Sequence, residues 1–256
     1  MAAAMNDDVI LSTAGLTKDF GGFRAVNGLD LQIRRGHIHA LIGPNGAGKT
    51  TCFNLLTKFL PPSAGRIFYE GRDITREKPA DVARAGLVRS FQISAVFPRL
   101  SVLANVRVAL QRKHGDSFDF WRSERRLDAY REEAMSLLDA VGLSDYAALP
   151  AAELSYGRKR ALEIAATIAL DPRMLLLDEP MAGMGREDVG RIEALIRKIS
   201  AGRTILMVEH NLSVVASISD RITVLARGEV LAEGDYATVS KDAGVIKAYI
   251  GAGHHG

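Results

Sequence analysis

The chain has 256 residues, a formal net charge of +3 and a sequence pI near 9.0. This length allows one large core or two modest domains. The positive charge is mild and mixed with 30 acidic residues, so composition does not argue for nucleic-acid binding, and the single cysteine excludes an internal disulfide.

The N-terminal segment, residues 1–8, contains neither a basic region nor a long apolar run, so we expect no signal peptide. No stretch approaches the ~18 apolar residues that span a bilayer. Any role at a membrane would therefore come through partner proteins.

Residues 9–42 alternate apolar and polar positions between glycine-containing turn signals, which predicts antiparallel strands. A further short strand is expected at Arg66–Tyr69. Within the first stretch, His37–Ile42 is mostly apolar and is expected to be the strand that leads into the next motif.

Residues 43–50 read Gly-Pro-Asn-Gly-Ala-Gly-Lys-Thr, the G-x-x-x-x-G-K-T pattern of a phosphate-binding loop. A strand before it and a helix expected at Thr50–Leu60 supply the context that this loop needs. We expect Lys49 to bridge the β- and γ-phosphates of a nucleotide and Thr50 to bind Mg²⁺. The residues expected to bind the nucleotide here are Asn45, Gly46, Ala47, Gly48, Lys49, Thr50 and Thr51. A glycine-rich turn that binds nothing is the alternative.

Cys52 falls in the first turn of that helix, where a thiolate would be somewhat favoured. A packed, inert thiol is the ordinary expectation.

Between residues 101 and 146 apolar residues recur at helical spacing, and Gly142 is a helix stop signal. We interpret this stretch as a helical subdomain inserted between halves of the nucleotide-binding core. Its densest basic run, Arg122–Arg126, is expected to be a solvated helix face; a patch for membrane or nucleic acid is the minority interpretation.

Residues 174–180 read Met-Leu-Leu-Leu-Asp-Glu-Pro, an apolar run typical of a strand buried on both faces. Such a strand presents its last residues at the ligand-binding edge of a parallel sheet. Asp178 can bind Mg²⁺, and Glu179 can polarise the attacking water as general base. An acidic turn before Pro180 is the alternative.

After Asp178 the pattern returns to alternating helix and strand. We expect a helix at about 187–200, a strand at Thr204–Val208, and a hairpin at Ile222–Glu233 that turns at Arg227-Gly228.

Residues 154–158, Leu-Ser-Tyr-Gly-Arg, resemble the Leu-Ser-Gly-Gly-Gln signature of ATP-binding-cassette (ABC) ATPases. Three more elements of that family are present at their expected places along the chain: an aromatic for adenine at Phe20, a lid glutamine at Gln92, and a switch histidine at His210. Each also has an alternative without a role in nucleotide binding: Phe20 as a core phenylalanine beside Phe23, Gln92 as a surface glutamine, and His210 as a structural histidine.

The resemblance implies a single α/β domain over residues 1–256: a P-loop core with an antiparallel β subdomain and an inserted helical subdomain at about 93–165. It implies ATP and Mg²⁺ as cofactors, with Thr50, Gln92 and Asp178 at the metal. The catalytic residues implied are Glu179, His210, Gln92 and Lys49.

The resemblance also implies a trans site, in which Ser155 and Gly157 of one subunit close over the nucleotide held by the other. Two departures from the family pattern affect it. Tyr156 and Arg158 replace Gly and Gln of the signature, and Gly185 stands where an aspartate is usual.

The finer resemblance is to ATP-binding subunits of branched-chain amino-acid importers. It is carried by Phe20-Gly21-Gly22, Arg89-Ser90-Phe91-Gln92, the signature, Met181-Ala182-Gly183-Met184, Val208-Glu209-His210-Asn211 and Ala248-Tyr249-Ile250-Gly251. It implies a peripheral protein at the cytoplasmic face of the inner membrane.

The implied partners are two integral-membrane permease subunits, a second ABC ATPase and, indirectly, a periplasmic solute-binding protein, but no nucleic acid. A groove around Gln92 and residues 93–110 would receive a permease helix. Alternatives are a lipopolysaccharide-export ATPase, a soluble ABC protein of translation or repair, and a P-loop GTPase. The last two lack their expected marks here, such as fused cassettes or an Asn-Lys-x-Asp motif.

Overall fold

The computed structural model describes residues 8–90, 96–113 and 130–252, and it divides the chain into two compact units. The first comprises residues 1–88, 173–179 and 200–256, and the second comprises residues 89–172 and 180–199. The second unit therefore contains the whole range of the predicted insertion, about 93–165, together with a helix that follows Asp178.

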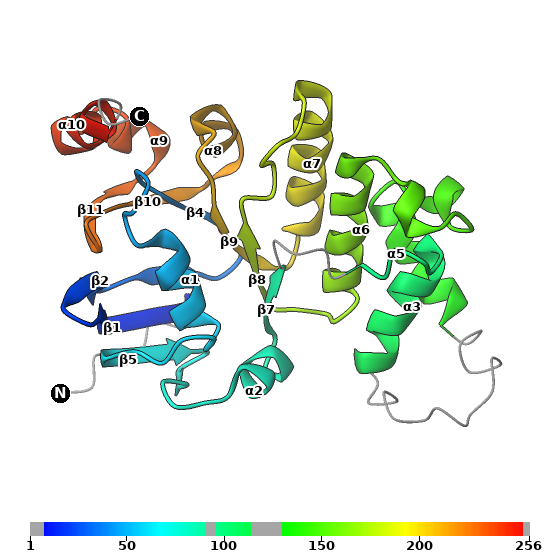
Figure 1. Cartoon of the computed structure of the whole chain (residues 1–256), viewed down its shortest axis with the longest axis horizontal. Coiled ribbons are helices and arrows are strands. Elements are labelled where there is room, and N and C mark those ends of the chain that lie inside the picture. Colours follow the sequence, from blue (N-terminus) through cyan, green and yellow to red (C-terminus); the bar gives the residue numbers. More distant parts are fainter. Residues whose placement is uncertain (1–7, 91–95, 114–129, 253–256) are drawn as a thin grey trace. The chain divides into compact units, whose positions relative to one another are not determined.

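The first unit contains a five-stranded antiparallel sheet (Figure 1). Its strands are β1 (Val9–Phe20), β2 (Phe23–Leu29), β3 (Gln32–Arg34), β5 (Ala64–Tyr69) and β6 (Arg72–Asp73). The long strand β1 pairs antiparallel with β2, β3 and β5. This arrangement confirms the antiparallel strands predicted from alternation, because alternating residues such as Ile33 turn one face inward while their neighbours stay exposed.

A second sheet has six strands in the order β11-β10-β4-β9-β8-β7. They are β4 (Ile38–Ile42), β7 (Leu87–Ser90), β8 (Met174–Asp178), β9 (Thr204–Val208), β10 (Arg221–Ala226) and β11 (Glu229–Gly234). β4, β8 and β9 run parallel, and every residue in them is buried. β10 and β11 form the predicted hairpin around Arg227-Gly228.

One strand of residues 9–42 departs from the prediction, because β4 joins the parallel sheet rather than the antiparallel one. The physical reason is visible in its sequence, Ile-His-Ala-Leu-Ile, which is nearly continuous rather than alternating. Continuous apolar runs belong in strands that are covered on both faces.

The helices of the first unit are α1 (Lys49–Leu56), α2 (Pro79–Arg84), α8 (Leu212–Ile218), α9 (Tyr236–Val239) and α10 (Ala243–Ala252). α1 ends four residues before the predicted Leu60. Lys58 takes the left-handed conformation with φ of 65°, and Leu60 precedes a proline, which disfavours helical backbone there.

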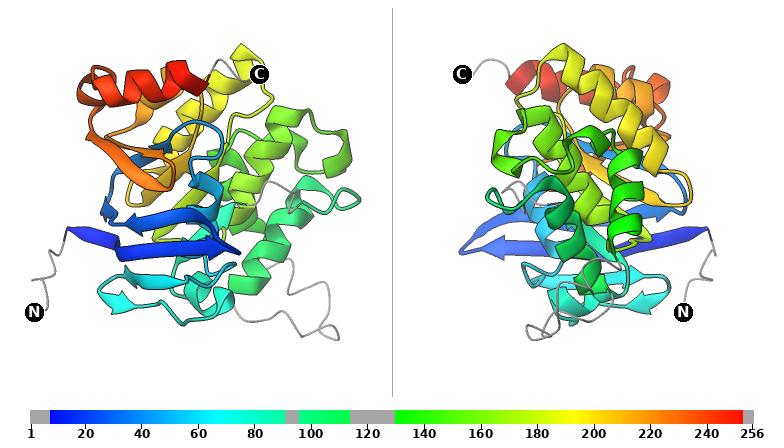
Figure 2. Two further views of the ribbon diagram at one scale, coloured as in Figure 1. Left: turned by 60° about the vertical axis from the view of Figure 1, so that its left-hand side comes forward. Right: turned by 90° about the vertical axis from the view of Figure 1, so that its right-hand side faces the viewer.

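The second unit is mainly helical in the part that the structure describes. It contains α3 (Val102–Lys113), α5 (Arg131–Ala140), α6 (Tyr156–Ile168) and α7 (Arg186–Ile199), with short 3₁₀ turns at Ser144–Tyr146 and Ala151–Glu153. α3 packs against both α5 and α6, as Figure 2 shows in green. Gly142 follows α5 with φ of 71°, which confirms the predicted helix stop. The basic run Arg122–Arg126 lies outside the described residues.

No helix among the described residues is long and apolar enough to cross a bilayer.

Candidate nucleotide-binding site

The carboxyl ends of three parallel strands bring the main candidate residues to one edge of the second sheet. Gly43 follows β4, Asp178 ends β8, and Glu209 follows β9. Because parallel strands end at the same edge, segments distant in sequence meet there. This edge belongs entirely to the first unit.

The phosphate loop runs from Gly43 to the first turn of α1 and needs glycine at positions of close backbone approach. A Cβ on Gly43 would lie 2.1 Å from the carbonyl oxygen of Leu225, and one on Gly48 would lie 2.4 Å from that of Ala25. Both glycines also have positive φ, of 148° and 100°. Asn45 and Gly46 are exposed at the tip, and the Thr50 side chain is exposed in the first turn of α1.

Lys49 extends back into this loop rather than into solvent. Its Nζ donates hydrogen bonds to the carbonyl oxygens of Gly43 and Pro44 at 2.6 and 2.9 Å. Burial lowers the pKa of Lys49, and the carboxylates of Glu179 and Asp178 act in the opposite direction. The ammonium group therefore lies among the groups that would surround a phosphate.

Glu179 and His210 form a direct pair at this edge. His210 Nε2 lies 2.7 Å from Glu179 Oε1, and both side chains are partly exposed. Glu179 has φ of 46°, and its backbone N–H donates to the carbonyl oxygen of Val208. The left-handed backbone turns the side chain out of the strand direction, and strain of this kind clusters at functional sites.

Glu209 was not singled out in the sequence, yet it organises the segment that carries His210. Its buried carboxylate accepts hydrogen bonds from the backbone N–H groups of His210 and Asn211, at 3.2 and 3.4 Å. Asn211 then caps α8 by accepting from Ser213 and Val214. The sequence does contain a signal for this role, because Glu209 is an acidic residue between a buried strand and the N-cap residue Asn211.

Phe20 lies at the end of β1 opposite Phe23, and the two side chains are 45% and 64% exposed. Lys18 Nζ lies 5.2 Å from the centre of the Phe20 ring. The alternative of a core phenylalanine is therefore wrong. An exposed ring on a strand end is available to stack on a flat ligand.

The oxygen atoms of Thr50 and Asp178 suit Mg²⁺, which prefers hard oxygen ligands and keeps several of its waters. Asp178 is almost fully buried at the end of β8, next to Lys49. The residues present thus fit the predicted metal, and Gln92, the third predicted ligand, lies outside the described residues.

The signature residues belong to the second unit, where Ser155 is the N-cap of α6. Ser155 and Tyr156 are exposed, whereas Gly157 is buried, and a Cβ on it would lie 2.6 Å from the Asp188 carboxylate of α7. Arg158 lies over the ring of Tyr146, 4.3 Å from its centre. Around Gly185, which stands at the usual aspartate position, there is open space.

Cys52 is fully buried in α1, and burial raises the pKa of its thiol to about 12. The alternative of a favoured thiolate is therefore wrong, and the thiol is a packed core group.

Two family models match this chain. Residues 26–182 match the one described as ABC transporter, and residues 229–255 match the one described as branched-chain amino acid ATP-binding cassette transporter.

Named relatives agree with these matches. The chain is 40% identical to the high-affinity branched-chain amino acid transport ATP-binding protein BraF of Pseudomonas aeruginosa, over 94% of this chain and 98% of that protein. LivG of Escherichia coli K12, with the same description, is 37% identical over 94% and 98%. Among solved structures, the ADP conformation of an ATP-binding cassette of an ABC transporter matches with a TM-score of 0.84 and 31% identity, over 95% and 99% of the two chains.

Proposed function

Because this chain belongs to the ABC transporter family, among the ATP-binding proteins of branched-chain amino acid transport, we propose that it powers uptake of leucine, isoleucine, valine or similar hydrophobic amino acids. It is an ATP-binding subunit that hydrolyses ATP. The observation that carries the proposal is the convergence of the phosphate loop, Asp178 and the Glu179–His210 pair at one sheet edge.

Lys49 acts first, as the ligand of the β- and γ-phosphates of ATP. To reach them, its ammonium group exchanges the carbonyl oxygens of Gly43 and Pro44 for phosphate oxygens. The exposed backbone of Asn45 and Gly46, with Ala47, Gly48 and the start of α1, supplies N–H groups for the remaining phosphate oxygens. Thr51 completes the set in the first turn, and Phe20 stacks on the adenine.

Glu179 acts as the general base. His210 Nε2 holds one of its carboxylate oxygens, which leaves the other to polarise the attacking water and accept its proton. His210 is thus a positioning residue, held in turn by Glu209 beneath its backbone. In this proposal Gln92 senses the γ-phosphate from the lid.

Thr50 and Asp178 would hold Mg²⁺, together with Gln92. When bound, the ion would neutralise charge that develops on the phosphate oxygens. The protein contribution is to hold the buried Asp178 carboxyl group beside Lys49.

The working ATPase in this proposal is a dimer, formed with a second copy or with a paralogue. Ser155 offers an exposed hydroxyl at the N-terminus of α6, where a helix favours phosphate charge, and Gly157 offers its backbone. Each would complete the site of the opposite subunit. The dimer would bind two permease subunits at the cytoplasmic face of the inner membrane, which receive solute from a periplasmic binding protein.

Uptake of radiolabelled leucine by cells that lack this protein tests the proposed function. Wild type should restore uptake, and Glu179→Gln should not, because the amide cannot accept the proton of water. The purified Glu179→Gln variant should bind ATP and hydrolyse it about 10²–10⁴-fold more slowly.

The matched control is Glu187→Gln, which changes the same kind of group in an exposed ion pair with Arg191. It should restore uptake fully. Normal hydrolysis by Glu179→Gln would remove Glu179 as the base, and unchanged leucine uptake in the deleted cells would contradict the proposed solute.

Capture of the protein from mildly solubilised membranes tests the partners. Two permease subunits and a second cassette ATPase are expected. Recovery of lipopolysaccharide-export proteins, or of no membrane protein, would contradict the assignment.

A further inference from the structure

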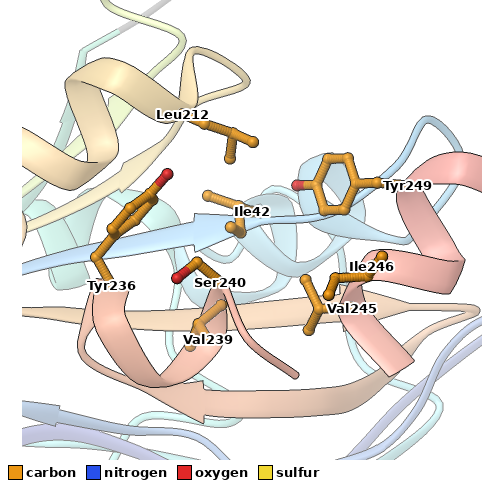
Figure 3. A pocket seen from close by; sticks show the side chains of 8 residues that line it. All are labelled: Ile42, Leu212, Tyr236, Val239, Ser240, Val245, Ile246 and Tyr249. Carbon is orange, nitrogen blue, oxygen red and sulfur yellow. The ribbon is translucent and has the colours of Figure 1, made fainter. Parts of the chain in front are cut away.

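A pocket in the first unit lies beside the phosphate loop but outside the nucleotide-binding residues. It has a volume of about 250 Å³, and Figure 3 shows the side chains that line it. Its walls are mainly aliphatic and come from β4, α8, α9 and α10: Ile42, Leu212, Val239, Val245 and Ile246. None of the described residues that line it carries a charge, so it would reject an ionised ligand.

The polar groups of the pocket are hydroxyls, from Tyr236, Ser240 and Tyr249. The Tyr249 hydroxyl is buried, and it donates to no acceptor among the residues that the structure describes. Burial raises the pKa of Tyr249, and a hydrogen bond from the backbone N–H of Gly43 to the phenol oxygen acts in the opposite direction. A buried hydroxyl proton without an acceptor costs free energy that a hydrogen-bonding ligand would recover.

The size of the pocket suits a molecule slightly larger than benzene. An apolar cavity of about 150 Å³ is enough to hold benzene, whereas drug-sized ligands occupy pockets of about 300 Å³ or more. Figure 3 shows the Tyr236 and Tyr249 rings to either side of Ile42 and Leu212, so the lining combines aromatic and aliphatic side chains.

Three of the residues that line the pocket are tied to the nucleotide site. Ile42 directly precedes Gly43, and the Tyr249 phenol lies close enough to the Gly43 backbone to affect its titration. Leu212 opens α8, directly after the Asn211 cap and the His210 switch position. A ligand that shifts these side chains would therefore also move the backbone next to the phosphate loop and next to His210 of the Glu179–His210 pair.

We propose that this pocket binds a small, neutral, largely apolar molecule with one hydrogen-bonding group, and that its occupancy changes nucleotide affinity at the neighbouring phosphate loop. The proposal goes beyond the transport function and does not depend on which solute is carried. By linkage, nucleotide must change the affinity of the pocket ligand by the same factor.

Binding is tested on the purified full chain with isoleucine, leucine and valine methyl groups labelled for NMR. Benzyl alcohol is the probe, with toluene lacking the hydroxyl and benzoate carrying a charge. Benzyl alcohol should shift the pocket methyl signals saturably, toluene should bind more weakly, and benzoate should not bind. Tyr249→Phe should weaken benzyl alcohol binding roughly two- to tenfold and leave toluene unchanged. Tyr146→Phe, which removes a phenol hydroxyl in the second unit, is the matched control and should change neither affinity.

Ile246→Trp should abolish binding by filling the pocket from an exposed position on α10. Lys247→Trp, an exposed neighbour outside the pocket, should not. Absence of saturable shifts with benzyl alcohol, or equal binding of benzoate, would overturn the site. ADP affinity is then measured with the pocket saturated, and an unchanged affinity would overturn the coupling. These readouts need neither hydrolysis nor a permease, so they can fail independently of the proposed function.

Discussion

His39 is a fully buried imidazole at the second position of β4, a strand in which every residue is buried. Its Nε2 lies 2.7 Å from the Thr223 hydroxyl, which donates to Glu233. Glu233 also accepts from Arg221 at 2.6 Å. Burial lowers the pKa of His39 to about 4, although the charge of Glu233 acts in the opposite direction.

This histidine makes the stability of the first unit depend on pH. The unfolded chain binds a proton near pH 6.5, whereas the folded chain resists it down to about pH 4. The contribution of neutral, buried His39 to the free energy of unfolding is complete above pH 6.5 and is lost progressively as pH falls towards 4. Between pH 7.5 and 5 the loss should be about 2 kcal/mol, measured by urea unfolding.

In His39→Gln this part of the pH dependence should disappear. Thr223→Val, which keeps the imidazole but removes its partner, should retain it. Identical pH profiles for wild type and His39→Gln would show that His39 is protonated as easily in the folded chain as in the unfolded one.

At the scale of elements, the phosphate loop is held by its glycines in two different ways. Gly46 has φ of 76° and free space around it, so alanine there would meet only backbone strain. Gly48 has φ of 100° and also approaches the Ala25 carbonyl oxygen, so alanine would meet both strain and a clash with backbone.

The two alanine variants should therefore differ. Gly46→Ala should lower the free energy of unfolding by about 1 kcal/mol. Gly48→Ala should cost several times as much or weaken nucleotide binding, because the loop or β2 must move. Thermal unfolding and binding of a fluorescent ATP analogue measure both effects. Equal losses in the two variants would contradict the role of the Ala25 contact.

Elements with strong local patterns could be predicted from the sequence: the alternating strands, β8, β9 and the hairpin of β10 and β11. The phosphate loop is equally local, since its spacing alone indicates where the backbone wraps. The end of α1 was predicted too late, because the apolar pattern continues through Phe59 and Leu60 after the backbone has left the helix.

Features that join distant segments could not be predicted. The approach of Asp188 to Gly157, and that of Tyr249 to Gly43, connect residues far apart in the chain. Neither has a local pattern, because each depends on how helices pack. Glu209 had a local signal, an acidic residue between a buried strand and an N-cap residue, but its bond to the backbone N–H of His210 was not predicted.

At the scale of the whole molecule, the predicted trans site requires two subunits, so it can be tested through ATP-induced dimer formation. Ser155→Arg should leave ATP binding by the monomer intact and prevent ATP-induced dimer formation, because a long cation replaces an exposed hydroxyl at the N-terminus of α6. The dimer is measured by size-exclusion chromatography with light scattering, in a Glu179→Gln background that retains ATP.

Ala148→Arg adds the same charge at another exposed position of the second unit and should dimerise normally. Normal ATP-induced dimer formation by the Ser155 variant would contradict the prediction that the signature residues lie at the dimer interface.

The two carbonyl oxygens that hold Lys49 bear on how the enzyme returns to its starting state. A buried ammonium group left bare after product departure would make that departure costly. Gly43 and Pro44 offer the ammonium group two partners within the loop itself. Phosphate oxygens must therefore compete with these carbonyl oxygens for Lys49, so the free energy that nucleotide gains at this residue is only the difference between two sets of partners.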